Sequence, residues 1–129
     1  MLQIRPEQMQ ALSTYTVRKF EDRMVLHLNK YFPEKCKKLG KDGTRKAIRY
    51  GLQRAAGYEI TSERDVCIYI DVMFEFGRNF DLDPRLPWAS EILNDEGLAG
   101  EPSEKVNELY DAAMENIKRA SGIETDTEV

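Results

Sequence analysis

The stretch "DVCIYIDVMFEFG", residues 65–77, decides how this chain folds, because it is apolar in a sequence of which 33% is charged. Its β-branched and aromatic residues favour a strand, but the sequence holds no second segment of this type with which a strand could pair. Charged residues around it stand at positions 64, 71, 75 and 78, a spacing that places them on one stripe of a helix. We therefore predict a helix over residues 63–76 that is surrounded by other helices.

Local signals set the ends of this helix. Ser62 is suited to cap its start, and Asp65 three residues later gives a shortened capping box. Gly77 is suited to end it, because glycine adopts the backbone angles that stop a helix. The apolar stretch is therefore predicted to be one complete helix at the centre of the core.

The rest of the chain also has helical spacing. A helix over residues 6–32 is predicted between Pro6 and Pro33, with an apolar stripe made of Met9, Leu12, Thr16 or Val17, Phe20, Met24, Leu28 and Tyr31. We expect a short helical turn over 33–40, a loop over 41–44 ("KDGT"), and further helices over about 44–56, 88–95 and 104–121.

Two cap positions and one inward stripe complete the prediction. Gly57 is expected in a left-handed conformation after the helix over 44–56, and Ser103 is expected to cap the last helix. The inward residues of that helix are predicted to be Val106, Leu109 or Tyr110, Ala113, Ile117 and Ala120. The fold class is thus all-α: a single compact helical bundle, one domain over residues 1–121, with a polar tail over 122–129.

Composition indicates a cytoplasmic protein. No apolar run reaches the roughly 20 residues that span a bilayer, and the first residues, "MLQIRPEQMQ", lack the basic and apolar segments of a secretory signal. The two cysteines, Cys36 and Cys67, allow one disulfide by count. Because Cys67 stands inside the apolar stretch, we expect two free thiols instead.

Charge is unevenly distributed along the chain. The net charge is −4, but residues 1–90 hold 16 Lys and Arg against 12 Asp and Glu, whereas residues 91–129 hold 3 against 11. An acidic C-terminal third disfavours nucleic acid as the partner, because phosphate binding needs a basic surface. The basic run over residues 35–54 leaves a nucleic-acid-binding regulator open as an alternative, but the preferred interpretation is a solvated face that offsets the acidic C-terminal helix.

The candidate metal patterns are incomplete. Asn79, Asp81 and Asp83 have the spacing of the first calcium-loop ligands, but Pro84 and Ser90 stand where that loop needs Gly and Glu. We expect the two aspartates to bind turn backbone instead. A di-iron site would need a Glu-x-x-His pair that the sequence lacks.

Catalytic patterns are also missing. The only histidine is His27, which excludes zinc sites built from several histidines. We predict no catalytic residue, no metal site and no cofactor, so the chain is predicted not to be an enzyme.

Acidic side chains are the candidate partner-binding residues. Glu104, Glu108, Asp111 and Glu115 recur at three- to four-residue spacing, so they share one face of the last helix. Asp71 and Glu75, one turn apart, form either a solvated stripe or a contact for a basic partner. Trp88, the only tryptophan, could anchor an interface or plug its loop onto the core.

Residues 57–89, "GYEITSERDVCIYIDVMFEFGRNFDLDPRLPWA", resemble a pattern in small bacterial proteins encoded beside type VI secretion effectors and other polymorphic toxins. That pattern reads "YGI-SE-DV--YI-L-F--G--FD-DP--PWA". The matching positions are Gly57–Ile60, Ser62–Glu63, Asp65–Val66, Tyr69–Ile70, Phe74, Gly77, Phe80–Asp81, Asp83–Pro84 and Pro87–Ala89. Gly57 and Tyr58 stand in reversed order. The resemblance covers about a quarter of the chain and implies an accessory role near an effector, with no catalytic residue to transfer.

Three functions follow as expectations. The first is a non-enzymatic protein-binding accessory protein that acts on a secreted effector or toxin as adaptor, chaperone or co-factor. The second is an immunity protein that neutralises a toxin, and the third is the nucleic-acid-binding regulator. A homo-oligomer is compatible with each of them.

Overall fold

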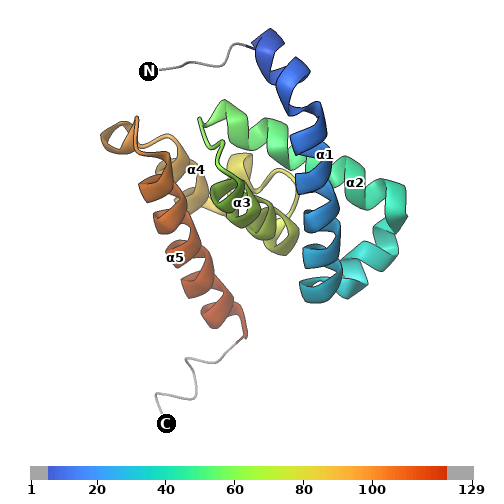
Figure 1. Cartoon of the computed structure of the whole chain (residues 1–129). Helices are drawn as coiled ribbons and strands as arrows, with labels where there is room; N and C mark the ends of the chain where they lie inside the picture. Colours follow the sequence, from blue (N-terminus) through green and yellow to red (C-terminus); the bar gives the residue numbers. More distant parts are fainter. Residues whose placement is uncertain (1–5, 122–129) are drawn as a thin grey trace. The chain divides into compact units, whose positions relative to one another are not determined.

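The computed structural model describes residues 6–121 and the side chains of residues 16–120. Within this range the chain forms five α-helices and two 3-10 helices, with no strand, which confirms the all-α prediction (Figure 1). The elements are α1 (Pro6–Tyr31), α2 (Pro33–Gly57), α3 (Glu63–Phe76), η1 (Phe80–Leu82), α4 (Pro87–Leu93), η2 (Glu96–Leu98) and α5 (Pro102–Ser121). The predicted tail over 122–129 lies outside the described residues.

The chain divides into two compact units, Met1–Tyr50 and Gly51–Val129, and the division falls inside α2. We call them unit 1 and unit 2. Unit 1 holds α1 and the first part of α2, and unit 2 holds every later element. The single domain predicted over 1–121 stays a prediction.

In unit 1, α1 ends where its sequence indicated. Tyr31 is its last residue because Pro33 disfavours helical angles at Phe32. Phe20, Met24 and Leu28 are buried as predicted, whereas Tyr31 is 60% exposed, so its predicted inward position is wrong. The side chains of Met9 and Leu12 lie outside the described range.

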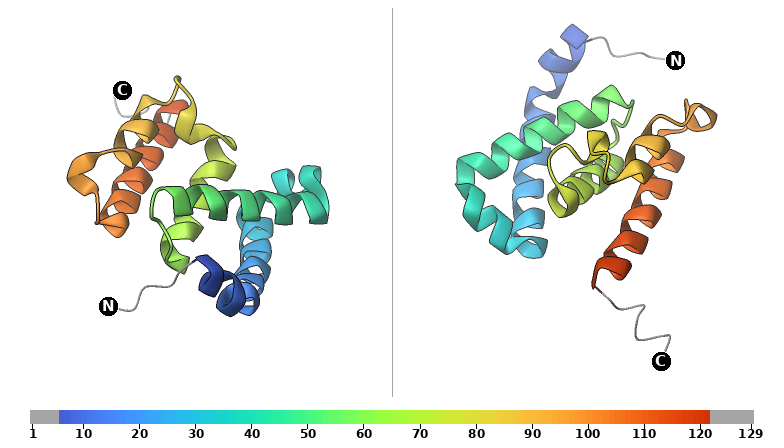
Figure 2. Two further views of the ribbon diagram at one scale, coloured as in Figure 1. Left: turned by 90° about the horizontal axis from the view of Figure 1, so that it is seen from above. Right: turned by 180° about the vertical axis from the view of Figure 1, so that it is seen from behind.

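The predicted loop over residues 41–44 is wrong, because α2 continues through it. Gly40 alone departs from helical angles, with φ 78° and ψ 172°, a conformation that glycine adopts without a Cβ clash. Both views in Figure 2 show α2 changing direction in its first part. Gly40 therefore ends the short first helix of α2, as predicted, and a second helix starts directly after it where a loop was expected.

The end of α2 also differs from the prediction. The left-handed residue is Glu59, with φ 67°, and Gly57 is the last helical residue. The N–H of Ile60 donates to the carbonyl of Ala55 and the N–H of Glu59 to that of Ala56, each at 2.9 Å. This is a Schellman motif, and its apolar contact is supplied by the fully buried Ile60.

In unit 2, α3 has the predicted bounds and the predicted caps. The Ser62 Oγ accepts from the Asp65 N–H at 3.2 Å, and the Gly77 N–H donates to the Met73 carbonyl at 2.8 Å. The helix packs against α5 and η1. Its buried residues are Asp65, Val66, Tyr69, Ile70, Val72, Met73 and Phe74. The stretch that opened the sequence analysis is thus a buried helix.

The last helix starts two residues earlier than predicted. Because α5 begins at Pro102, Ser103 lies inside its first turn, and the Ser103 hydroxyl donates to Asp65 Oδ2 on α3 at 2.8 Å. The predicted cap is therefore wrong, and the serine joins two helices instead. α5 also packs against α4, beside which it runs in both views of Figure 2.

Candidate functional site

The outer side of α5 carries a row of carboxylates that we call the acidic face: Glu104, Glu108, Asp111 and Glu115. All four side chains are exposed. Their three- to four-residue spacing places them opposite Val106, Leu109 and Ala113, which are buried. Of the other residues predicted to point inward, Ile117 is half-buried and Ala120 is exposed.

No ion pair joins the acidic face to any other described side chain. Like charges one turn apart destabilise a helix by roughly 0.2–0.5 kcal/mol per pair. The acidic face therefore imposes a small cost on the folded chain, and a basic partner would remove that cost.

Two large apolar side chains lie beside the acidic face. Tyr110 is 47% exposed and Met114 is 37% exposed, and they stand one turn apart on α5. Sequence spacing left Leu109 and Tyr110 as alternatives for the inward position, and the structure buries Leu109. Tyrosine and methionine are enriched in protein interfaces, so this side of α5 combines charge with apolar surface.

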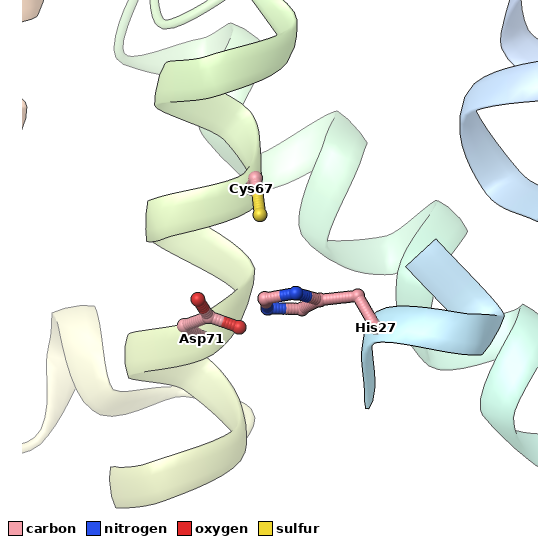
Figure 3. Close-up of side chains that lie close together, drawn as sticks. All are labelled: His27, Cys67 and Asp71. Atoms are coloured by element: carbon pink, nitrogen blue, oxygen red, sulfur yellow. The ribbon is translucent and has the colours of Figure 1, made fainter. Parts of the chain in front are cut away.

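Asp71 and Glu75 lie one turn apart on α3, half-buried and exposed, and both interact with other side chains of the protein. Figure 3 shows Asp71 with Cys67 on the same side of α3. Burial, and then the charge of Asp71, raise the pKa of Cys67 to about 11, so this thiol is protonated and unreactive at neutral pH. His27, also drawn there, belongs to unit 1.

Both cysteines are free thiols, as predicted. Cys36 is buried on α2, where it behaves as a small apolar residue.

Trp88 packs inside unit 2. Its ring meets Phe76 edge-on, with 5.2 Å between ring centroids and 74° between ring planes. The indole Nε1 is buried and has no hydrogen-bond partner among the described residues. These contacts favour the core role that the sequence left open; a role in partner binding stays a prediction.

The aspartates of the incomplete calcium pattern have partners inside the chain. Asp83 Oδ1 accepts from the backbone N–H of Arg85 at 2.9 Å, which confirms the predicted turn bond. Asp81 is fully buried, forms an ion pair with Arg54, and accepts from the Tyr58 hydroxyl at 2.7 Å. The backbone bond predicted for Asp81 is therefore wrong, because two side chains from the end of α2 take its place.

Two arginines of the basic run are neutralised within unit 1. Arg45 and Arg49 bind the buried Glu21 at 2.5 and 2.7 Å, and Arg45 also binds Asp22 at 2.8 Å. Sequence spacing gave no signal for this network, since its partners are more than 20 residues apart. Elsewhere in the basic run, a hollow is lined by the exposed side chains of Glu34, Lys35, Lys37 and Lys38.

Comparisons of the chain with protein-family models, with curated proteins and with solved structures find no match. Among the described residues, no helix combines the length and the apolar character that crossing a membrane requires.

Proposed function

We propose that this chain is a non-enzymatic accessory protein that binds a bacterial secreted effector or toxin in the cytoplasm, as an adaptor, chaperone or co-factor. The acidic face of α5 would contact a basic surface of that partner. The observation that carries the proposal is the set of four exposed carboxylates without an ion pair to any described side chain.

The proposed interface would use two kinds of contact. Exposed charges mainly steer association and act through the association rate. Tyr110 and Met114, partly exposed beside the acidic face, would lose water on binding and slow dissociation. Charge would then select a basic partner, and the apolar pair would hold it.

The buried carboxylates and the Cys67 thiol do not form an exposed reactive site, which supports a binding role. The buried carboxylates Glu21, Asp65 and Asp81 are each bound by side chains of this chain. The thiol of Cys67 stays protonated at neutral pH. The three buried carboxylates thus serve the fold, whereas the carboxylates of the acidic face are exposed to solvent and could bind a partner.

The choice of an effector as the partner rests on the resemblance of residues 57–89. Several matching positions are buried, among them Val66, Tyr69, Ile70, Phe80 and Ala89. The resemblance therefore concerns the core of unit 2 and supports a shared fold more than a shared binding surface.

The test first identifies any secreted effector or toxin encoded beside this chain. Binding to it is then measured by surface-based kinetics at low and high salt. The face variant carries Glu104→Lys, Glu108→Lys, Asp111→Lys and Glu115→Lys. The control variant carries Glu34→Lys, Glu59→Lys, Glu91→Lys and Glu96→Lys, which make the same change in net charge at exposed positions outside α5. We expect the face variant to lower the association rate by about tenfold or more at low salt, and much less at high salt.

Equal losses in the two variants would show an effect of net charge alone and would refute the proposed interface. A second variant, Tyr110→Ala with Met114→Ala, is expected to raise the dissociation rate at both salt concentrations. Growth of cells that co-express the effector separates the two roles: rescue of growth would identify an immunity protein, whereas an adaptor binds without neutralising.

A further inference from the structure

Unit 2 contains a buried polar cluster formed by Arg54, Tyr58, Tyr69 and Asp81. Asp81 Oδ2 takes both of the direct bonds in the cluster, from the Arg54 guanidinium and from the Tyr58 hydroxyl. The ring of Tyr69 lies 6.3 Å from that of Tyr58 and 5.1 Å from that of Phe80, the residue before Asp81. Three segments, the end of α2, the middle of α3 and η1, therefore meet at this cluster.

Three polar atoms of the cluster are buried without a hydrogen-bond partner among the described residues: Arg54 Nε, Tyr69 OH and Asp81 Oδ1. The side chains of Tyr69 and Asp81 have no exposed surface, so bulk solvent does not reach them. A buried polar group without a hydrogen-bond partner destabilises the folded state. Such a cost at three atoms of one cluster calls for a ligand that satisfies them together.

We propose that one internal water molecule binds in this cluster, accepting from Arg54 Nε, donating to Asp81 Oδ1 and sharing a hydrogen bond with the Tyr69 hydroxyl. An internal water typically makes about three hydrogen bonds to buried polar groups. The three atoms supply one donor, one acceptor and one hydroxyl that does either. The water would connect α3 to η1 through a bond that neither Tyr58 nor Arg54 provides directly.

The charges of the cluster favour a neutral ligand. Arg54 and Asp81 form an ion pair and cancel each other. A bound ion would therefore add an uncompensated charge in a buried place, which is costly. Tyrosine ionisation is also disfavoured, because burial and then the hydrogen bond to Asp81 raise the pKa of Tyr58 to about 12. Water meets both the charge and the hydrogen-bond requirements.

A crystal structure that resolves ordered waters tests the proposal, together with water–protein nuclear Overhauser effects in solution. Two variants that each remove one tyrosine hydroxyl are compared with the wild type. Tyr69→Phe removes one partner of the water, whereas Tyr58→Phe removes a direct bond to Asp81 Oδ2 and leaves all three partners of the water in place. We expect the water in the wild type and in Tyr58→Phe, and its loss in Tyr69→Phe.

Two results would overturn the proposal. One is a wild-type structure in which the Tyr69 hydroxyl binds Asp81 or Arg54 directly and no water is present. The other is a water that persists equally in both variants, since Tyr69 would then not hold it. If Tyr69→Phe fails to fold, the wild-type density and the Overhauser effects alone decide the question.

Discussion

Asp81 shows how much one residue depends on its partners. Its carboxylate is fully buried, and the Arg54 side chain that pairs with it is 31% exposed. Asp81→Ala leaves this arginine without its partner, which typically costs about 3–5 kcal/mol when both groups are buried. Because Arg54 is partly solvated, we expect a loss of roughly 2–3 kcal/mol in unfolding free energy, measured by urea denaturation.

Asp83→Ala provides the matched control, because the partner of Asp83, Arg85, is 86% exposed. Exposed pairs contribute little to stability, so the control is expected to lose much less stability than Asp81→Ala. Similar losses in the two variants would mean that the burial of Asp81 has no energetic weight.

Glu21 is a single residue that makes the stability of the folded chain depend on pH. Burial alone would raise its pKa, but hydrogen bonds from Arg49 and Arg45 outweigh burial and hold the pKa below the ordinary value of 4.5. A depressed pKa in the folded state adds stability that is complete above pH 4.5 and is lost as pH falls through the folded value. We therefore expect the unfolding free energy of Glu21→Gln to fall less steeply than that of the wild type as the pH decreases below 4.5.

Urea denaturation at a series of pH values below neutrality measures this slope. Glu91→Gln, an exposed glutamate on α4, serves as the control and is expected to keep the wild-type acid limb. An unchanged slope in Glu21→Gln would show that the arginine network does not shift this carboxyl group.

At the scale of elements, Gly51 decides how closely α2 approaches α3 within unit 2. A Cβ at this position would lie 2.8 Å from Ile70 Cγ1 and 3.1 Å from Met73 Cε. Alanine normally stabilises a helix by about 1 kcal/mol relative to glycine. Here we expect Gly51→Ala to destabilise by roughly 1–3 kcal/mol, because the added methyl overpacks the contact.

Gly57→Ala is the internal control for this substitution. No atom lies within 4 Å of the Cβ that it adds, and its backbone is helical, so a gain of up to about 1 kcal/mol is expected. Thermal unfolding of both variants gives the comparison. A gain at both positions would refute the close approach at Gly51.

Local chemistry explains which elements were predictable. The helix α3 follows from Ser62, Gly77 and its charge spacing, because all three signals lie within one short segment. The break at Gly40 follows from its residue type, but no local signal shows that a helix resumes at once over residues 41–44. Glu59 at the end of α2 was missed because its left-handed angle is stabilised by the burial of Ile60 and not by its own residue type.

The candidate site was also predictable only where its residues follow from spacing along one helix. The four carboxylates of the acidic face follow from spacing alone. The exposure of Tyr110 does not, because adjacent residues fit a helical period equally well and only packing chooses between them. The bonds from Arg54 to Asp81 and from Ser103 to Asp65 join residues 27 and 38 positions apart, and no local pattern encodes such pairs.

At the scale of the whole molecule, the uneven charge is only partly balanced within the chain. Glu21 and Asp22 neutralise two arginines of the basic run inside unit 1. The acidic face of α5 has no such partner among the described residues. The negative charge of the acidic face is therefore presented outward, where a basic partner could meet it.

The division inside α2 leads to a prediction about cooperativity. Domain boundaries normally fall in exposed linkers, whereas the boundary between Tyr50 and Gly51 lies within a continuous helical segment. We therefore expect one unfolding transition. Trp88, the only tryptophan, reports on unit 2 through its fluorescence, and far-ultraviolet circular dichroism reports on the helices of both units. The two midpoints in urea should coincide.

A substitution in unit 1 makes this test sharper. Leu28 is fully buried on α1, and Leu28→Ala typically costs about 2–5 kcal/mol. If the chain unfolds as one domain, the midpoint seen by Trp88 in unit 2 must fall by as much as the midpoint seen by circular dichroism, although the change lies in the other unit. A fluorescence midpoint that stays at the wild-type value while circular dichroism shows an earlier transition would establish two independent domains and refute the single domain.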